Sequence, residues 1–481
     1  RPRAREFDPS RQLPTPTRYA PLATYKRPLG PFGTGSLYDW DDAGDNRNYV
    51  EQRTALHVKA DFTDDVSAFI DLHDWGVWGE DFRSDYVIGA DTRAVTTDNV
   101  EVVQAYIEAN EMFGHPLRLR VGRQDLVMGN GWLVGNMVSP TLALTFDAAR
   151  LTFTPDDFVI DVWAAKLAEL MAEDDDTNFY GLHATYTGLE ALELSGYWFY
   201  LRDGLAPDDS PVSGLVQEVL EPVFDVNDYD HAQIHTVGLR ANGASNGFDY
   251  DANLAYQFGD AATLGALFAP FGYGDDDAEY GNWAADLDLG YTFDVKWSPR
   301  VYVGAAWFEG QDNRDLTLGE WLNPFYQPEA SVSFNRLFSK YWYTAVADIL
   351  GGASAMTNFR QVRTGISVKP SEKVSTGLKL AYFWVDEPFD IPYQYDLGFT
   401  EVSALLPFRT QEASDELGLL TTLWLKYNYT EDWFVSIGWE RVWTGQGVED
   451  GSYIFKNGVE FAGGTDDDDG NYIWLDTGLK F

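Results

Sequence analysis

Hydrophobic and polar side chains alternate at every second position along most of the chain. Between residues 50 and 62 the even positions are mostly apolar, whereas the odd positions include Glu51, Arg53 and Lys59. The same alternation recurs between residues 248 and 258. Because successive side chains of a β-strand point to opposite faces, this period predicts strands with one apolar face and one polar face.

Turn signals arrange these strands in pairs. Thr63-Asp64-Asp65 separates a strand at 50–62 from a strand at 66–75. Further hairpins are predicted at 99–125, 146–168, 178–201, 233–259, 282–310, 358–386 and 416–444, with a last strand at 471–481. Their turns are expected at 114–116, 155–157, 187–188, 242–243, 370–372 and 431–432. One more strand, around residues 19–25, would precede them and give an even total of about eighteen.

The connections between strands alternate in length. Tight turns close the hairpins, and long linkers join one hairpin to the next, for example at 78–98, 202–232, 260–281, 311–357 and 387–415. Bacterial outer-membrane barrels sort their connections in this way, with short periplasmic turns and long extracellular loops. The pattern therefore predicts an all-β fold, a single antiparallel transmembrane β-barrel of about 18 strands around an aqueous lumen. Residues 1–48 form a Pro-rich segment that contains or leads into the first strand, and residues 49–481 form the barrel.

Composition narrows the possible functions. The 481 residues include 34 basic and 76 acidic side chains, a net charge of −42, which argues against nucleic-acid binding. Cysteine is absent, which excludes disulfides, cysteine-ligated metal sites and thiol nucleophiles. No run of about 18 apolar residues predicts a transmembrane helix. Aromatic residues near the strand ends are expected to form two interfacial girdles: Trp75, Trp78, Trp163, Trp198, Tyr200, Trp297, Trp307, Trp433, Trp443 and Tyr472.

Position within each strand predicts which charged residues line the lumen. The predicted pore-lining residues are Arg53, His57, Lys59, Asp71, Glu108, Arg118, Arg120, Arg123, Arg150, Asp161, Asp249, Asp251, Asp286, Asp288, Arg363, Lys379 and Lys426. For Arg123 both faces remain open, because Gly122 is a candidate bulge position that would shift the alternation. Acids and bases are nearly balanced on this wall. Such a wall suits small hydrophilic solutes, whereas a conduit for a polyanion is expected to be net positive.

Negative charge concentrates in the long linkers, at 173–176, 203–230, 275–279 and 466–469. Carboxylate clusters of this kind can bind Ca²⁺ or Mg²⁺, but they lack EF-hand spacing, and solubilising loop charge is the alternative. His231 and His235 are the most metal-like pair, yet they lead into a strand and lack the helix that their spacing requires, so no metal site or cofactor is expected. None of the histidines lies in a nucleophile motif, so the sequence predicts no enzyme.

Several stretches resemble the alginate-export family of outer-membrane barrels. They are residues 53–79, Gln104-Ala105-Tyr106, the segment LRVGRQDLVMGNGWLVGN at 119–136, residues 146–151, 236–259, and 299–311 with 323–325. The resemblance implies an eighteen-stranded channel in the bacterial outer membrane and, for the best-known members, export of an anionic polysaccharide. The chain departs from the exporters at two positions: Asp125 follows GRQ where they carry a basic residue, and Gln104 stands where they have Arg.

Two channel functions therefore remain open. One is passive diffusion of small hydrophilic solutes with a weak preference for cations, and the other is export of an anionic polysaccharide such as alginate. A barrel enzyme or an adhesion scaffold that uses the long loops is a third hypothesis. The expected partners are outer-membrane lipid and lipopolysaccharide, the transported solute or polysaccharide, and accessory lipoproteins or further copies of the chain, but no nucleic acid.

Overall fold

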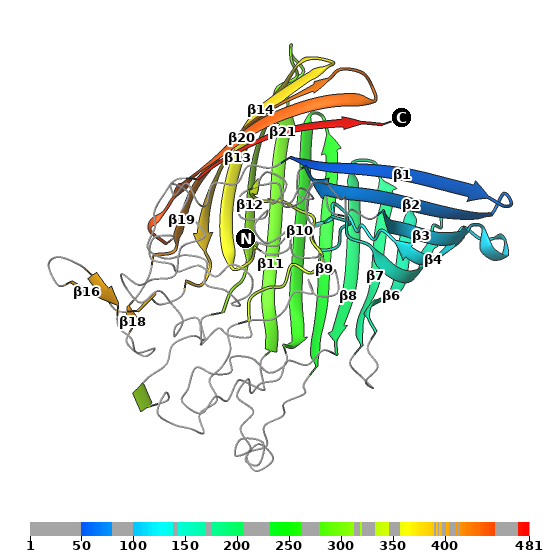
Figure 1. Ribbon diagram of the computed structural model, residues 1–481, viewed down its shortest axis with the longest axis horizontal. Helices are drawn as coiled ribbons and strands as arrows, with labels where there is room; N and C mark the ends of the chain where they lie inside the picture. Colours follow the sequence, from blue (N-terminus) through cyan, green and yellow to red (C-terminus); the bar gives the residue numbers. More distant parts are fainter. Residues whose placement is uncertain are drawn as a thin grey trace, which may run out of the picture.

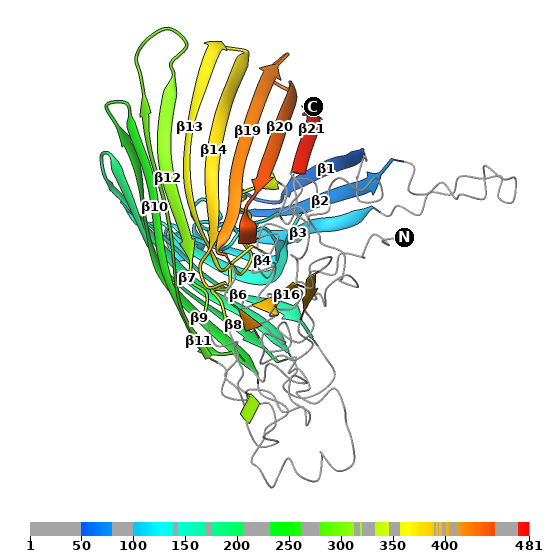
Figure 2. The same ribbon diagram turned by 90° about the vertical axis from the view of Figure 1, so that its left-hand side faces the viewer.

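The fold is described from a computed structural model. It describes residues 50–78, 100–137, 143–169, 176–204, 231–261, 279–311, 318–319, 332–345, 356–388, 391–392, 394–396, 401–403, 410–411, 414–447 and 470–480. Most of these residues lie in β-strands that wrap around a central space (Figures 1 and 2). In this part of the chain, no helix is both long and apolar enough to span a membrane.

Seventeen strands in the described residues form one antiparallel sheet, which confirms the predicted all-β fold of about eighteen strands. They are β1 (Glu51–Asp61), β2 (Val66–Val77), β3 (Glu101–Ala109), β4 (Leu117–Gln124), β5 (Phe146–Phe153), β6 (Phe158–Ala168), β7 (Thr177–Leu189), β8 (Leu192–Asp203), β9 (Ala232–Ser245), β10 (Phe248–Asp260), β11 (Glu279–Thr292), β12 (Arg300–Phe308), β13 (Phe359–Ser371), β14 (Val374–Val385), β19 (Glu416–Asn428), β20 (Trp433–Thr444) and β21 (Gly470–Leu479). Each strand pairs with the next one in this order. Two short ladders join β15 (Ile391–Pro392) to β18 (Thr410–Gln411) and β16 (Gln394–Asp396) to β17 (Glu401–Ser403).

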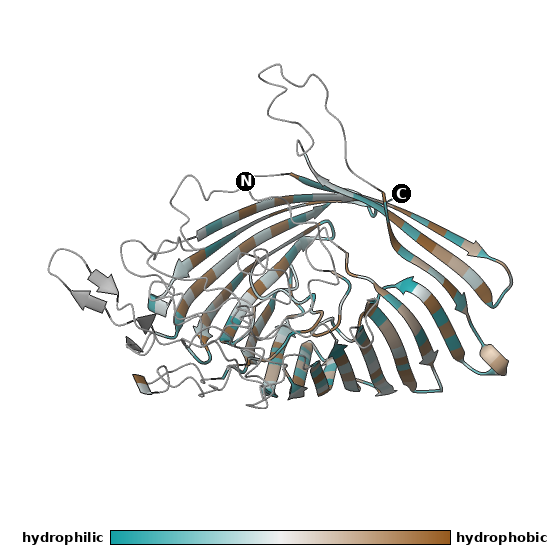
Figure 3. Ribbon diagram, turned by 60° about the horizontal axis from the view of Figure 1, so that its bottom comes forward, coloured by the Kyte–Doolittle hydropathy of each residue, from teal (hydrophilic) through white to brown (hydrophobic). Residues whose placement is uncertain are grey.

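The two faces of the sheet differ as the alternation predicts. On β11, Trp283 and Leu287 are about two-fifths exposed, whereas Asp286 between them and Tyr280 are almost fully buried. Apolar and polar residues alternate along the strands throughout the sheet (Figure 3). A sheet survives in hydrocarbon only if its backbone groups are paired and its outward side chains are apolar. The exposed face is therefore the lipid-facing face, and the other face is the inner wall.

The antiparallel order places all the short turns at one end of the strands. The long connections begin and finish at the opposite end, as predicted. Two of the predicted turn positions are wrong by a few residues. The β7–β8 turn is at 190–191 rather than 187–188, and the β9–β10 turn is Asn246-Gly247 rather than 242–243. Asn246 (φ 51°) and Gly247 (φ 84°) both adopt the left-handed conformation that a two-residue hairpin turn requires. The earlier Asn-Gly pair stays within β9 and pairs with β10.

The edges of the sheet are β1 and β21, and no ladder joins them in the described residues. Because the number of strands is odd, the two edge strands, β1 and β21, run in the same direction, from the long-loop side to the short-turn side. An antiparallel closure requires one additional strand between them. The strand predicted around residues 19–25 would fill this position, but it lies outside the described residues, so its place stays a prediction.

Candidate functional site in the barrel lumen

Two of the long connections send a segment onto the inner wall. We call residues 125–137, which follow β4, inner segment A, and residues 332–345, which lie between β12 and β13, inner segment B. The two segments pair with each other: Phe338 N donates to Leu133 O (2.9 Å), Gly135 N donates to Phe338 O (2.9 Å), and Lys340 N donates to Gly131 O (3.0 Å). A parallel bridge between Val134 and Phe338 completes this clasp. The clasp joins two parts of the chain that are far apart in sequence and fixes both of them inside the barrel.

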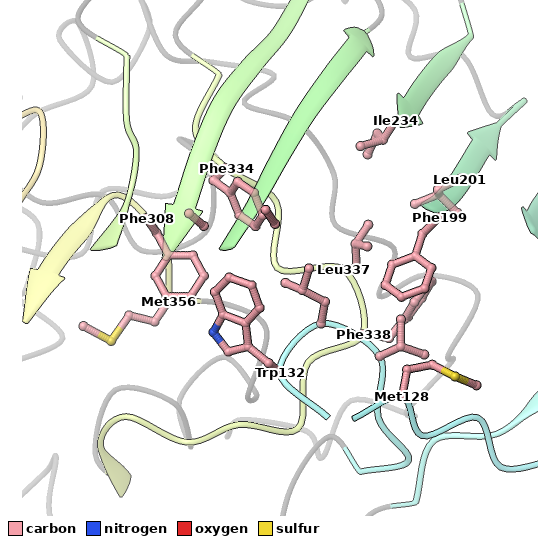
Figure 4. Packing of buried hydrophobic residues seen from close by; sticks show 14 of the residues in the cluster. Met128, Trp132, Phe199, Leu201, Ile234, Phe308, Phe334, Leu337, Phe338 and Met356 are labelled. Atoms are coloured by element: carbon pink, nitrogen blue, oxygen red, sulfur yellow. The ribbon is translucent and has the colours of Figure 1, made fainter. Parts of the chain in front are cut away.

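Aromatic packing holds the clasp against the wall. Trp132 is almost fully buried between Phe308 of β12 and Phe334, with ring centroids 5.6 and 6.5 Å away (Figure 4). Phe338 packs on Phe146 of β5 (5.1 Å) and Phe179 of β7 (4.9 Å). Burial of a large aromatic side chain contributes about 1.5–3 kcal/mol. These aromatic residues therefore form an apolar cluster at the contact between the inner segments and the inner wall.

Arg336 fixes the shape of inner segment B, although the sequence did not single it out. Its side chain is almost fully buried and donates to the carbonyls of Met356 (3.0 Å) and Tyr341 and to Ser339 Oγ (3.2 Å). Its guanidinium also lies 4.9 Å from the centre of the Tyr343 ring. Backbone carbonyls and an aromatic face thus provide partners for the buried Arg336 guanidinium. These contacts explain how the charge can be buried, and they hold inner segment B in place.

A charged network connects inner segment B to the wall. Arg363 of β13 lies between Asp286 and Asp288 of β11, with Nη1–Oδ2 and Nη2–Oδ2 distances of 3.0 and 2.8 Å. Tyr343 Oη donates to Asp286 Oδ2 (2.8 Å), and Tyr341 Oη donates to Asp288 Oδ2 (3.2 Å). Burial raises the pKa of the Tyr343 phenol well above its ordinary value, so this group stays a donor. The three charges predicted at 286, 288 and 363 thus form one cluster.

Several other charged residues on the inner wall form ion pairs with one another. Three pairs join neighbouring strands: Arg120–Glu108 (2.6 Å), Arg150–Asp161 (2.8 Å) and Arg240–Asp251 (2.7 Å). Arg300 of β12 pairs with Asp249 of β10 (2.5 Å) across the intervening strand β11. Arg300, Arg336 and Glu440 were absent from the predicted pore-lining residues. Glu440 accepts hydrogen bonds from Thr344 Oγ1 and Ala345 N of inner segment B, both at 2.7 Å. The alternation in β12 and β20 places Arg300 and Glu440 on the inner face, so that signal was present.

The remaining predicted residues make local contacts. Arg118 Nη2 donates to Thr152 Oγ1 (3.1 Å), and Lys379 Nζ donates to the carbonyl of Tyr343 (2.9 Å). Lys426 Nζ lies 4.5 Å above the Phe434 ring. On the edge strand β1, Lys59 pairs with Asp61 (2.9 Å), and Arg53 shares the face of His57.

Arg123 lies on the lipid-facing side, contrary to its place among the predicted pore-lining residues. Its Nε and Nη2 donate to Asp147 Oδ1 (2.8 Å) and Oδ2 (2.9 Å), and both side chains are about half exposed. Gly122 has φ +126° and a backbone so close to Ala105 O that a Cβ would meet it at 2.3 Å. The strand register nevertheless runs through Gly122 without a shift, so the regular alternation places Gln124 on the inner face and Arg123 on the outer one.

Three of the aromatic residues predicted for the girdles also lie on the inner face: Trp75, which is paired with Arg53, Tyr472, which is paired with Glu440, and Trp163. Trp163 is almost fully buried and packs on Phe179 and Phe199 at 5.7 and 5.6 Å. The alternation itself places Trp163 with Asp161 on the inner face of β6. By contrast, Trp198 and Trp433 are about two-fifths exposed on the outer face.

Beneath inner segment B the lumen contains a cavity of about 330 Å³. It is lined by aromatic and basic side chains, among them Arg300, Tyr302, Tyr341, Arg363, Lys379 and Trp424. Aromatic faces beside guanidinium and ammonium groups can contact the apolar faces and the acidic groups of a sugar ring. The cavity is therefore a candidate contact point for a solute that passes through the lumen.

Three further side chains meet where β1 pairs with β2. His57, Asp71 and His73 place their ligand atoms within 4.8 Å of one another, and among the described residues they are the only such metal-like group. His231 and His235 do not form one: His235 lies on the outer face, stacked between Tyr200 (4.4 Å) and Phe258 (5.0 Å). The sequence did not reveal the group, because its members come together only through the strand register.

Asp125 lies close to this group, at the start of inner segment A. It accepts a hydrogen bond from Asn136 Nδ2 (2.7 Å), and its backbone N–H donates to Gln104 Oε1 (3.2 Å). Burial raises the pKa of the Asp125 carboxyl above its usual value. The two positions at which the sequence departs from the exporters, 104 and 125, are thus in direct contact. Of the acidic linker clusters, 173–175, 205–230, 275–278 and 466–469 lie outside the described residues.

Comparison with known proteins gives one match in sequence and several in fold. The family described as alginate export matches residues 41–451. No curated protein sequence matches the chain. Among solved structures, Pseudomonas aeruginosa OccK8 (OprE) is 12% identical, with a TM-score of 0.48 over 90% of this chain and 94% of its own. Acinetobacter baumannii OccAB4 is 11% identical, with a TM-score of 0.45 over 84% and 89%, and Salmonella typhi OmpF in complex with daunomycin is 10% identical, with a TM-score of 0.37 over 71% and 86%.

Proposed function

Since the chain belongs to the alginate export family and lies in the bacterial outer membrane, we propose that it is a passive channel for small hydrophilic solutes with a weak preference for cations. The family is one of transport channels rather than enzymes. In this proposal the protein performs no catalytic step and needs no cofactor for transport.

The pairing of the arginines on the inner wall is the observation that supports this function most directly. Arg120, Arg150 and Arg240 each lie within 3 Å of a carboxylate on a neighbouring strand, and Arg363 contacts two. A polyanion that enters a narrow, low-dielectric passage requires unpaired positive charge along its path. Paired charges instead form short transverse dipoles, which small polar solutes of either sign can pass.

The narrowing of the lumen supports a solute of limited size. The clasp of inner segments A and B occupies part of the interior that a sheet of this many strands would otherwise leave open. Polar groups of both segments, including Asn130 Nδ2, which donates to Asp251 Oδ2 (3.3 Å), meet the charged wall. A hydrophilic solute would pass between these polar surfaces.

The preference for cations is inferred from the overall charge. The chain carries a net charge of −42, and the sequence concentrates acids in the long connections. A negative rim raises the local concentration of cations at the mouth. The same acidic clusters are also candidates for Ca²⁺ binding.

The test is a single-channel recording in planar bilayers. In a KCl gradient we expect a weak cation preference that declines as the salt concentration rises, because salt screens the rim charges. Added polyuronate is expected to leave the current unchanged. Anion selectivity, or block by polyuronate, would contradict this function.

Export of an anionic polysaccharide such as alginate is the second candidate. The cavity that contains Arg300, Lys379 and Trp424 favours it, because aromatic and basic groups together suit an acidic sugar. Block by polyuronate that is lost in an Arg300→Gln variant would support export. A matched Arg123→Gln variant on the outer face should leave that block intact.

The proposed partners follow from the location. Membrane lipid contacts the exposed apolar face, and lipopolysaccharide is proposed to contact the half-exposed Arg123–Asp147 pair at the long-loop ends of β4 and β5. Accessory lipoproteins and assembly with further copies of the chain are additional proposals that the sequence suggests. Cross-linking in intact outer membranes would detect either.

A further inference from the structure

Two histidines converge on one buried carboxylate oxygen where β1 pairs with β2. The register places His57 opposite Asp71, and His73 lies two residues further along the same face of β2. The distance to Asp71 Oδ1 is 3.1 Å from His57 Nε2 and 2.9 Å from His73 Nε2. The pairing of β1 with β2 therefore holds the three side chains in place. The alternation of apolar and polar residues in both strands supports this pairing.

The Asp71 carboxylate at the centre of this group is buried on the inner wall. Asp71 is 4% exposed, and both imidazoles approach its Oδ1 through their Nε2 atoms. Its other oxygen, Oδ2, accepts from Gln104 Nε2 (3.4 Å). Two imidazoles that converge on one buried carboxylate oxygen call for an explanation.

A metal ion would explain the convergence of the three ligand atoms. Ligand atoms about 2.0–2.1 Å from a zinc ion are about 3.0–3.4 Å from one another, and the two nitrogen–oxygen distances here are 3.1 and 2.9 Å. Two imidazoles and one carboxylate favour transition metals such as zinc, copper, nickel or iron over Ca²⁺ and Mg²⁺. We propose that His57, Asp71 and His73 form a binding site for a divalent transition-metal ion of the zinc type on the lumen wall.

The surroundings of the group suit a bound cation. Gln104 bridges Asp71 and the backbone N–H of Asp125, so Asp71 is oriented by a hydrogen-bonded neighbour, as metal-ligating carboxylates usually are. Asp125 and Arg53 are close enough to interact electrostatically with His73 or Asp71. His57 is the exposed ligand, so the ion enters from that side.

This site goes beyond the proposed channel function, because it depends only on the residues of one hairpin and their neighbours. A bound ion would add positive charge to a wall that is otherwise balanced. We therefore expect zinc to change the current through the channel, whichever solute the channel carries.

The experiment measures Zn²⁺ binding to the full chain in detergent by calorimetry, in a large excess of Ca²⁺ that occupies sites made of carboxylates alone. We expect one Zn²⁺ site in the unaltered protein. His57→Gln and His73→Gln should each weaken binding at least about tenfold. The control is His235→Gln, which removes an imidazole from the outer face and should bind as the unaltered protein does.

Two additional measurements keep the test decisive. The shift in gel mobility on heating shows whether each variant is a folded barrel, and the absorption spectrum of bound Co²⁺ reports the coordination geometry of the site. Equal Zn²⁺ binding by the His73→Gln and unaltered proteins would overturn the site, as would an absence of binding above the Ca²⁺ background. The ion preference of the channel is to be recorded with a metal chelator present, so failure of the metal site leaves the test of the channel function unaffected.

Discussion

The charge of Arg363 contributes to the stability of the lumen wall because it balances a buried carboxylate. Arg363 is 5% exposed and neutralises Asp286, which is 2% exposed, while Asp286 also accepts the Tyr343 hydroxyl of inner segment B. A buried carboxylate that loses its cation costs far more than an exposed pair contributes.

We expect Arg363→Gln to lower the free energy of unfolding by about 3–5 kcal/mol. Denaturant unfolding in micelles, followed by tryptophan fluorescence, measures this change. Arg123→Gln is the matched control, because it breaks an equally short pair that is about half exposed, and it should cost about 0–1 kcal/mol. Similar losses in the two variants would contradict the role of burial.

At the scale of whole elements, the clasp of the inner segments is held by a few aromatic contacts. The Trp132 ring packs against Phe308 and Phe334, and its indole N–H donates a hydrogen bond to Tyr343 Oη (2.9 Å). Removing it therefore weakens both the apolar contact and the link to the charged network.

We expect Trp132→Ala to release the clasp, at a cost of about 3–5 kcal/mol, and to raise the single-channel conductance. Conductance in planar bilayers is the measurement. Trp433→Ala serves as the control, because Trp433 is exposed near the short turns, where its indole N–H donates to Thr477 Oγ1 (2.9 Å). An unchanged conductance in Trp132→Ala would show that the clasp does not limit the current.

The turn between β9 and β10 allows a test of backbone conformation. Gly247 has φ +84°, and a Cβ there would lie 2.7 Å from the carbonyl oxygen of Thr292. Gly247→Val should therefore lower stability by about 1–3 kcal/mol. In Gly281→Ala, where nothing lies within 4 Å of the added atom, denaturant unfolding should be nearly unchanged. A loss in Gly281→Ala as large as in Gly247→Val would point to a general effect of glycine replacement.

Sequence alternation could predict the strands and the face of most charged residues, because both depend on a local period of two. It could not predict the clasp, since Trp132 and Phe334 lie in segments without periodicity. A signal was nevertheless present: Phe146, Phe308 and Phe359 occupy inner-face positions and so require an apolar partner inside the barrel. The group around Asp71 depends on strand register, which alternation alone does not give.

For the molecule as a whole, closure of the barrel requires that the edge strands β1 and β21 be joined. Unpaired backbone groups in hydrocarbon cost several kcal/mol each, so two free edges are not viable in a membrane. We propose that a strand from residues 1–48 lies between them.

Deletion of residues 1–48 should then abolish the folded, heat-modifiable form of the protein. Because the chain contains no cysteine, disulfide cross-linking of single cysteines at 15–30 to a Thr477→Cys variant can locate the strand directly. A deletion variant that folds and conducts as the full chain does would contradict this proposal.

The clasp also has a consequence for how the channel is made. Lys340 and Asn136, which it brings together, are 204 residues apart in the chain. Contacts of such long range form late, because the intervening strands must first be ordered. During assembly, the lumen would thus stay unobstructed until the strands of the second half of the sheet are in place. Insertion of the barrel into the membrane before the clasp forms would leave a pore that is permeable without selection. The order of insertion and clasp formation during biogenesis is therefore a property on which selection can act.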